Sequence, residues 1–181
     1  MQTLSEHITN LQHRMNMDIF ISKDDIDKKS ILFIENLTIL VAQVRKSIIL
    51  LREQKKYHNL FDCFPNGCCE YSSLILKKIL TSYKINSCIM YGELKQSGAP
   101  HCWLEVEDRY DVDITIDQFQ EFDIPVLVYI KAENKTFHQR YFKNIKKNGY
   151  QALVWDEFGK EDDVEDFVNF MKEIVSKHER K

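Results

Sequence analysis

A cysteine, a histidine and an aspartate follow one another along the chain, each at a position that suits the same chemical reaction. Cys69 follows a Pro-Asn-Gly turn and begins a predicted helix, His101 begins a predicted strand, and Asp113 lies on the next strand. A thiol attacks as its thiolate, which the free N–H groups of a helix N-terminus stabilise. A histidine can accept the thiol proton, and a carboxylate can hold the imidazole in the required tautomer. These residues therefore predict a thiol catalytic triad.

Two segments that alternate apolar and polar residues predict how the histidine and the aspartate meet. Residues 101–107 and 110–117 both alternate, as half-buried strands do. If the short connection between them closes a hairpin, its odd number of residues leaves His101 and Asp113 on one face, as direct or diagonal neighbours. We expect the helix that begins at Cys69 to pack across this face and bring its thiol to the imidazole.

The rest of the pattern predicts the elements around this hairpin. Apolar residues recur at helical spacing in four segments, which are 1–17, 30–56, 69–83 and 161–176. Two further segments, 87–92 and 126–130, are predicted strands, whereas residues 137–155 give no clear pattern. Helices separated from consecutive antiparallel strands are typical of an α+β fold rather than of a doubly wound sheet.

Length and composition indicate one globular domain. The 181 residues are 44% hydrophobic and 29% charged, which provides enough apolar material for a core. We expect a single domain over 1–181, with a helical N-terminal extension (1–59), a catalytic core (60–130) and a C-terminal strand and helix that complete it (131–181). A net charge of −3 argues against binding nucleic acid by bulk electrostatics.

The compartment and the partners follow from what the sequence lacks. The first residues contain no apolar stretch typical of a signal peptide, and charged residues interrupt the apolar segment 31–51, so we expect no membrane span. Five cysteines, an odd number, do not suggest a disulfide framework. We therefore expect a cytoplasmic protein, although a chain exported as an effector by a dedicated machine would look the same.

Metal and cofactor sites are not predicted. The cysteines and His101 supply the ligand types of a zinc site, but no C-x₂-C pair is present and no second pair lies at the usual distance. No phosphate loop and no dinucleotide fingerprint appears either. We expect no metal and no other cofactor.

Three segments resemble the transglutaminase-like superfamily, which is related to the papain-like cysteine proteases. Residues 67–72 (GCCEYS), with apolar pairs later in the helix, resemble its G-x-C helix signature. Residues 101–106 (HCWLEV) resemble its H-x-W strand, and residues 113–115 (DIT) resemble its D-x-T segment. The resemblance covers about residues 60–120 and implies a nucleophile helix packed on an antiparallel sheet. FPNGCC at 64–69, with DIT and DQF after it, also resembles a group of small bacterial proteins, which implies no substrate.

The resemblance also implies a mechanism. The thiolate of Cys69 attacks a carbonyl carbon, His101 protonates the leaving amine, and water or an amine resolves the thioester. Asp113 orients the imidazole. The backbone N–H of the nucleophile and a second donor hold the oxyanion, and Asn66 is a candidate for that donor. Trp103 could form a wall of the cleft.

These features predict a thiol-dependent acyl-transfer enzyme of the cysteine peptidase, amidase or deamidase, or transglutaminase type. Its expected substrate is an amide bond of a peptide or protein, with neither nucleic acid nor membrane as a partner; the oligomeric state is not indicated. Members of the family that have lost the triad only bind, so the alternative is a non-catalytic protein-binding module. Two positions stay open. Cys68 also fits as nucleophile, and Asp111 and Asp117 share the face of Asp113, with Asp117 the next candidate for the third member.

Overall fold

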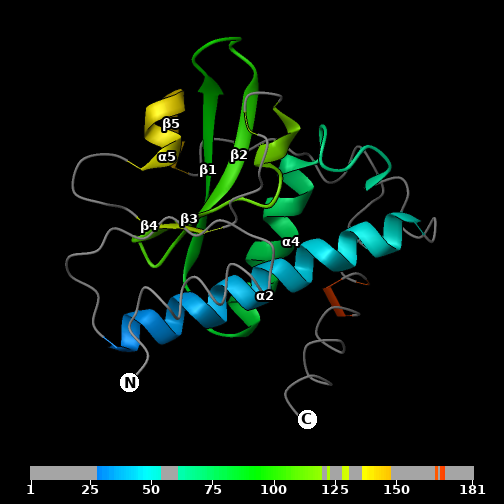
Figure 1. The fold of residues 1–181 in the computed structure, drawn as a ribbon, viewed down its shortest axis with the longest axis vertical. Helices are drawn as coiled ribbons and strands as arrows, with labels where there is room; N and C mark the ends of the chain where they lie inside the picture. The colour runs from blue at the N-terminus through cyan, green and yellow to red at the C-terminus, as the bar shows by residue number, and fades with distance from the viewer. Residues whose placement is uncertain are drawn as a thin grey trace.

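The computed structural model describes residues 28–53, 61–119, 122, 128–130, 136–147, 166, 168 and 169. These residues form an α+β fold with an open five-stranded antiparallel sheet in the order β4-β3-β2-β1-β5 (Figure 1). The elements are α2 (Lys28–Glu53), α4 (Cys69–Ser82), β1 (Ser87–Leu94), β2 (Pro100–Val106), β3 (Tyr110–Val112), η1 (Ile116–Gln118), β4 (Val128–Ile130), α5 (Phe137–Tyr141) and β5 (Phe142–Lys147).

One hydrophobic core lies between the two long helices and one face of the sheet. Apolar residues at helical spacing give α2 and α4 one buried stripe each, which packs with Leu104, Val106 and Val112 of the sheet. In Figure 1, α2 runs beside α4 and past the β3–β4 side of the sheet. The two helices predicted over 30–56 and 69–83 are thus confirmed, with slightly different ends.

A second, smaller core covers the opposite face of the sheet. Its buried members are Leu94, Trp103, Ile116 and Phe142. The alternation along β2 separates the two cores, because Trp103 points to one face and Leu104 to the other. The expected packing of α4 across the face of His101 is therefore wrong. The helix covers the opposite face, since its apolar stripe packs with Leu104, and it meets the histidine only at its first turn.

The hairpin between β2 and β3 has the expected form. Leu104 pairs with Val112, and Val106 pairs with Tyr110. Asp113 follows the last paired residue of β3, and its carboxylate reaches the His101 ring at 2.6 Å.

The strand predicted over 110–117 is wrong beyond Val112, where β3 ends. The carboxylate of Asp113 accepts a hydrogen bond from the backbone N–H of Thr115 at 2.9 Å. Such a local bond competes with a sheet ladder and turns the chain. The chain then forms η1 instead of extending β3.

Segment 137–155, which had no clear pattern, contains α5 and β5 in its described part. Thr136 caps α5 by accepting from Gln139 N–H, and the Gln139 side chain accepts from Thr136 N–H. The predicted helix over 1–17 lies outside the described residues, and so do most residues of the helix predicted over 161–176. Within the latter, Asp166, Val168 and Asn169 are helical.

No helix in the part of the chain that the structure describes has both the length and the apolar character needed to cross a membrane.

We expect Gly92→Ala to destabilise the sheet by about 1–3 kcal/mol, the usual cost of overpacking a core. Gly92 pairs with His101 across β1 and β2, and a Cβ atom at this position would lie 3.0 Å from Trp103 Cη2 and 3.2 Å from Phe142 Cβ. Urea unfolding followed by tryptophan fluorescence measures the loss. An unchanged midpoint would contradict the close packing.

Candidate active site

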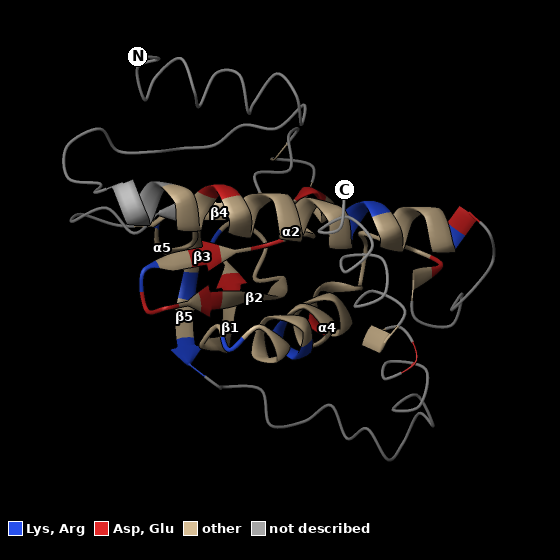
Figure 2. Ribbon diagram, turned by 90° about the horizontal axis from the view of Figure 1, so that it is seen from below, with Lys and Arg blue, Asp and Glu red and all other residues tan. Residues whose placement is uncertain are grey.

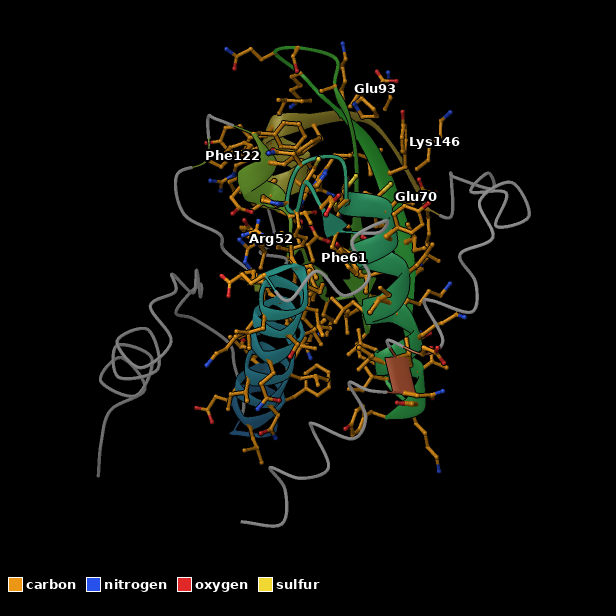
Figure 3. All side chains as sticks on the ribbon, turned by 90° about the vertical axis from the view of Figure 1, so that its right-hand side faces the viewer. Arg52, Phe61, Glu70, Glu93, Phe122 and Lys146 are labelled. Atoms are coloured by element: carbon orange, nitrogen blue, oxygen red, sulfur yellow. The ribbon has the colours of Figure 1, made fainter. Side chains whose placement is uncertain are left out.

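Cys69 is held at the start of α4 by a tight turn. Backbone hydrogen bonds link Phe64 to Phe61, Asn66 to Cys63 and Cys68 to Pro65 within residues 61–68. Gly67 has a φ of +65°, a conformation that favours glycine. The side chain of Arg52, at the end of α2, donates to the Phe64 carbonyl at 2.7 Å, and Figure 3 shows Arg52 and Phe61 beside this turn. The turn is therefore anchored to the longest helix.

The two adjacent cysteines have different environments. Cys68 is 4% exposed, and its thiol donates to the Asn66 carbonyl at 3.3 Å. Cys69 is only partly buried and interacts with His101. This geometry favours Cys69 over Cys68 as the nucleophile.

His101 is completely buried, and both of its ring nitrogens have partners. Its Nε2 lies 2.6 Å from Asp113 Oδ2, and its Nδ1 lies 2.7 Å from the amide nitrogen of Gln118. The amide oxygen of Gln118 in turn accepts from Gly67 N–H at 3.3 Å. The side chain of Gln118 therefore connects the histidine with the turn that precedes Cys69.

Asp113 accepts hydrogen bonds at both carboxylate oxygens. Oδ2 faces His101 Nε2 at 2.6 Å and His138 Nε2 at 3.0 Å, while Oδ1 accepts from Thr115 N–H at 2.9 Å and Thr115 O–H at 3.2 Å. Burial alone would raise the pKa of Asp113, but the charges and hydrogen bonds of the two histidines hold it below its usual range. The carboxylate is therefore ionised and can fix the His101 imidazole.

The surroundings of Cys69 favour its thiolate. A hydrogen bond from the Cys102 side chain lowers the pKa of Cys69, burial raises it, and His101 lowers it again, to about 4 overall. Because a thiol is a weak hydrogen-bond donor, we assign most of the lowering of the Cys69 pKa to the histidine and to the helix N-terminus.

The surroundings of His101 favour its positively charged form. Burial would lower the pKa of His101, but Asp113 and Cys69 raise it to about 9. The pKa of Cys102 is raised by the neighbouring Cys69 and by burial, so Cys102 stays a thiol. These pKa shifts favour a thiolate–imidazolium pair of Cys69 and His101 at neutral pH.

Asp117, the alternative third member, is engaged elsewhere. Its carboxylate accepts two bonds from the Arg45 guanidinium, at 2.6 and 3.0 Å. Arg45 also donates to the Ile114 carbonyl and lies 5.1 Å from the centre of the Phe64 ring. Arg45 thus links η1 to α2 and to the turn over residues 61–68. The geometry favours Asp113 as the partner of the histidine.

The two residues predicted to bind substrate lie differently. Asn66 is exposed in the turn, where its backbone carbonyl accepts from Cys68. Trp103 is 1% exposed, and its ring stacks on His138 with centroids 4.3 Å apart. A side chain this deeply buried belongs to the second core that supports the site and does not line an open cleft.

His138 and Gln118 contact the site, and the sequence analysis missed both. His138 belongs to α5, and the Thr136–Gln139 capping box was a local signal for that helix. Gln118 is brought back to the site by the turn that Asp113 and Thr115 start. No local pattern indicates either contact, since each joins segments that are far apart in sequence.

Glu70 is a further ionisable group beside the nucleophile. It lies in the first turn of α4, where Figure 3 labels it. Burial and the neighbouring Cys69 raise the pKa of Glu70 to about 7. Glu70 can therefore gain or lose a proton near neutral pH beside the Cys69 sulfur.

His101, Asp113 and His138 are residue types that could hold a metal ion, with one ligand atom of each within 4.8 Å of the others. Two ligands of a tetrahedral zinc ion lie about 3.3 Å apart, given zinc–nitrogen distances of about 2.0–2.1 Å. The 2.6 Å between His101 Nε2 and Asp113 Oδ2 is shorter and fits a charge-assisted hydrogen bond. The arrangement therefore favours a hydrogen-bonded group over a metal centre.

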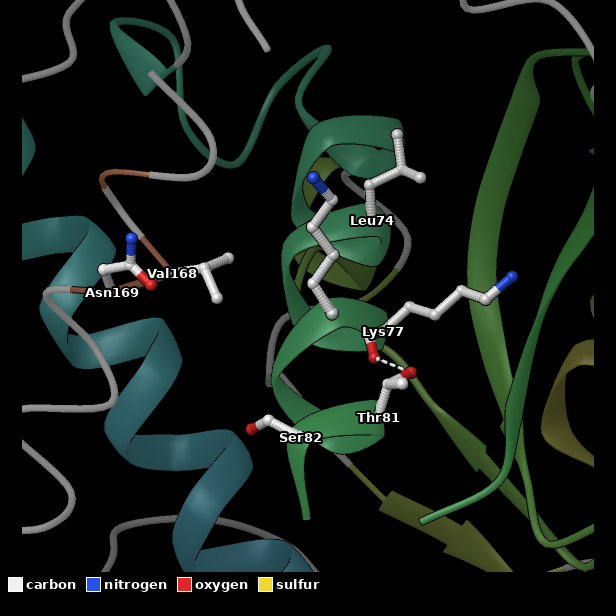
Figure 4. A pocket seen from close by; sticks show the side chains of 7 residues that line it. Leu74, Lys77, Thr81, Ser82, Val168 and Asn169 are labelled. Carbon is white, nitrogen blue, oxygen red and sulfur yellow. Dashed lines mark hydrogen bonds between the residues drawn. The ribbon is translucent and has the colours of Figure 1, made fainter. Parts of the chain in front are cut away.

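A pocket of about 590 Å³ lies along the second half of α4, away from its first turn (Figure 4). Its lining consists of Leu74, Lys77, Lys78, Thr81, Ser82, Val168 and Asn169. None of these residues belongs to the Cys69 site.

Basic residues gather on β5 and acidic residues on β2 and β3 (Figure 2). Lys147 lies 3.1 Å from Glu105 and 2.8 Å from Asp108. Lys147 and Asp108 are exposed whereas Glu105 is buried, so these are ion pairs at the edge of the sheet surface, separate from the Cys69 site.

Comparison with known proteins found no matching family model, no matching curated protein and no matching solved structure.

Proposed function

We propose that this chain is a thiol-dependent acyl-transfer enzyme that acts on amide bonds of a peptide or protein through Cys69, His101 and Asp113. The observation that carries the proposal is one buried histidine that bonds Asp113 at 2.6 Å and interacts with a cysteine at a helix N-terminus. The family we propose is the transglutaminase-like superfamily, because its three resembling segments supply these three residues.

The residues suggest the following steps. Asp113 holds Nε2 of His101, which leaves Nδ1 for the thiol. The Cys69 thiolate attacks the carbonyl carbon, and the oxyanion accepts from the Cys69 N–H and a second donor. Gln118 is a candidate for that donor beside Asn66, because its amide already reaches both His101 and the nucleophile turn. His101 protonates the leaving amine, and water or an amine then resolves the thioester.

One contact favours the alternative, a non-catalytic binding module. The amide nitrogen of Gln118 donates to Nδ1 of a neutral His101, and so occupies the nitrogen that should serve Cys69. An imidazolium carries a proton on Nδ1, so the amide must then rotate or move away. If Gln118 keeps this hydrogen bond to Nδ1, His101 cannot take the thiol proton, and Cys69 remains an ordinary thiol.

The pH dependence of Cys69 alkylation separates the two functions. We expect a midpoint near pH 4 in the wild type, and in His101→Gln a rise toward the ordinary thiol value of 9.0. The midpoint is the diagnostic quantity, because a thiolate of low pKa is intrinsically a weaker nucleophile and the rates change less. Iodoacetamide labelling followed by peptide mass spectrometry measures it for each cysteine.

Two variants serve as controls. Cys68→Ala should leave the Cys69 midpoint unchanged, and Cys102→Ala should raise it less than His101→Gln does. An ordinary midpoint in the wild type would favour the binding module, and fast labelling of Cys68 alone would reassign the nucleophile. Peptide cleavage, ammonia release from glutamine peptides and amine incorporation then distinguish the reactions, each with Cys69→Ala as the blank.

A further inference from the structure

Two more buried side chains continue the line that runs from His101 through Asp113. His138 on α5 is completely buried, with Nε2 3.0 Å from Asp113 Oδ2 and Nδ1 3.3 Å from Asp111 Oδ2. The same oxygen of Asp113 receives His101 Nε2 at 2.6 Å. Four side chains from β2, β3, the segment after β3 and α5 therefore form one buried series, His101–Asp113–His138–Asp111.

The contacts of His138 determine its charge. Nε2 bonds Asp113, whereas Nδ1 lies at ion-pair distance from Asp111 without the geometry of a hydrogen bond, so a neutral ring would turn a lone pair toward one of the two carboxylates. Burial alone would lower the pKa of His138, but hydrogen bonds and charges of the two aspartates raise it. These contacts favour the imidazolium form of His138, whose charge offsets one of the two buried negative charges.

The other rings around His138 are compatible with a positive charge on it. The Trp103 ring stacks on it at 4.3 Å and 15°, an arrangement that favours a cation. His101 lies parallel to it at 6.3 Å, and the Tyr129 ring of β4 meets its edge at 5.2 Å. Burial and the nearby carboxylates raise the pKa of Tyr129, so the phenol stays neutral.

We propose that the Asp111–His138 pair is a positioning unit that holds Asp113 in place and sets the buried charge against which Cys69 ionises. This inference rests on the function proposed above. Without the charge of His138 the buried series carries one more net negative charge, so the Cys69 thiolate forms less readily. A His138 that only fills space would affect folding stability and leave the ionisation of Cys69 unchanged.

A charge-balanced pair of variants tests the proposal. His138→Gln keeps an amide donor for Asp113 but removes the positive charge, and we expect it to raise the Cys69 alkylation midpoint by about 1 pH unit. The double variant Asp111→Asn/His138→Gln removes one charge of each sign, so its midpoint should return toward the wild-type value. His101, Cys102 and Glu70, which face Cys69, are unchanged in both variants.

Two results from these variants would overturn the proposal. One is an unchanged midpoint in His138→Gln, and the other is a double variant no closer to the wild type than the single one. Urea unfolding of each variant separates these effects from a loss of stability. Stoichiometric zinc binding that His138→Gln abolishes would also overturn it, because the group would then be a metal site.

Imidazole nitrogen NMR of the wild-type protein tests the proposal independently of whether the variants fold. We expect both nitrogens of His138 to be protonated at pH 7, and a neutral ring would overturn the proposal. If wild-type Cys69 titrates as an ordinary thiol, the proposed function fails. In that case the pKa of His101 tests the inference. The substitution His138→Gln should raise that pKa, and an unchanged pKa of His101 would overturn the inference.

Discussion

Asp113→Asn is expected to lower the free energy of unfolding by about 3–5 kcal/mol, the range for removing one partner of a buried ion pair. The carboxylate is 2% exposed and accepts from His101, His138 and Thr115. An amide of the same size loses the charge that both imidazoles need, and in either orientation it turns an NH₂ group toward existing donors. Urea denaturation at pH 7 measures the loss.

The same substitution should raise the Cys69 alkylation midpoint, because a His101 without its carboxylate no longer holds the proton that pairs with the thiolate. Asp117→Asn is the matched control, since it removes an identical charge four residues along the chain. Its pair with Arg45 is about one-fifth exposed on the aspartate side, so we expect a loss of no more than about 1 kcal/mol and an unchanged Cys69 profile. A larger shift of the Cys69 midpoint in Asp117→Asn would make Asp117 the third member.

Local periodicity was enough to predict the hairpin that joins His101 and Asp113. Alternation along 101–106 is a property of consecutive residues, and a tight hairpin fixes the register of the strands that it joins. A helix start at Cys69 was also predictable, because a Pro-Asn-Gly turn ends one segment and apolar residues at helical spacing begin the next. These features bring two of the three residues together without any long-range information.

The face that α4 covers was not predictable in the same way. Trp103 and Leu104 are both apolar and both buried, so alternation along β2 separates two faces without indicating which one receives the helix. The second core forms because β5 pairs with β1 from a distant part of the chain. Only that pairing brings Phe142 onto the face that carries His101.

The same long-range pairing explains why His138 was missed. His138 lies in α5, the short helix directly before β5. The β1–β5 pairing therefore places this helix against Asp111 and Asp113. A single histidine in a helix of five residues gives no periodic signal. Gln118 was missed for a different reason, because the Asp113–Thr115 bond turns the chain where alternation suggested a continuing strand.

Cys69→Ala is expected to change how stability depends on pH, not only how stable the protein is. Between pH 6.5 and 9.0, the ordinary pKa values of histidine and cysteine, the unfolded chain has a neutral His101 and a protonated Cys69, which together hold one proton. The folded ion pair also holds one proton, on the imidazole. Because folding neither takes up nor releases a proton at these two groups, their contribution to the free energy of unfolding should be level in this window.

Removing the thiol breaks this balance. In Cys69→Ala the unfolded chain holds no proton at His101. The folded imidazole still holds one, because Asp113 keeps its pKa raised. A raised histidine pKa gives stability that is complete below pH 6.5 and is lost as the pH rises through the folded pKa, which in this variant lies below the wild-type value of about 9 because Cys69 no longer contributes to it. The variant should therefore lose up to about 1.4 kcal/mol per pH unit relative to the wild type across the window.

Chemical denaturation at several pH values, with Cys68→Ala as the control, checks this expectation. Contributions from Asp113 and His138 are common to all three proteins and cancel in the comparison. Glu70, whose pKa of about 7 depends on Cys69, does not cancel, so the curves are compared above about pH 8, where its carboxylate is ionised in every protein. An ordinary Cys69 thiol beside a raised His101 would make wild type and Cys69→Ala fall in parallel, because each folded protein then holds one proton more than its unfolded chain. A neutral His101 would leave both curves level. Only the thiolate–imidazolium pair predicts a level wild type with a falling Cys69→Ala, so parallel curves would contradict the charged pair on which the proposed chemistry depends.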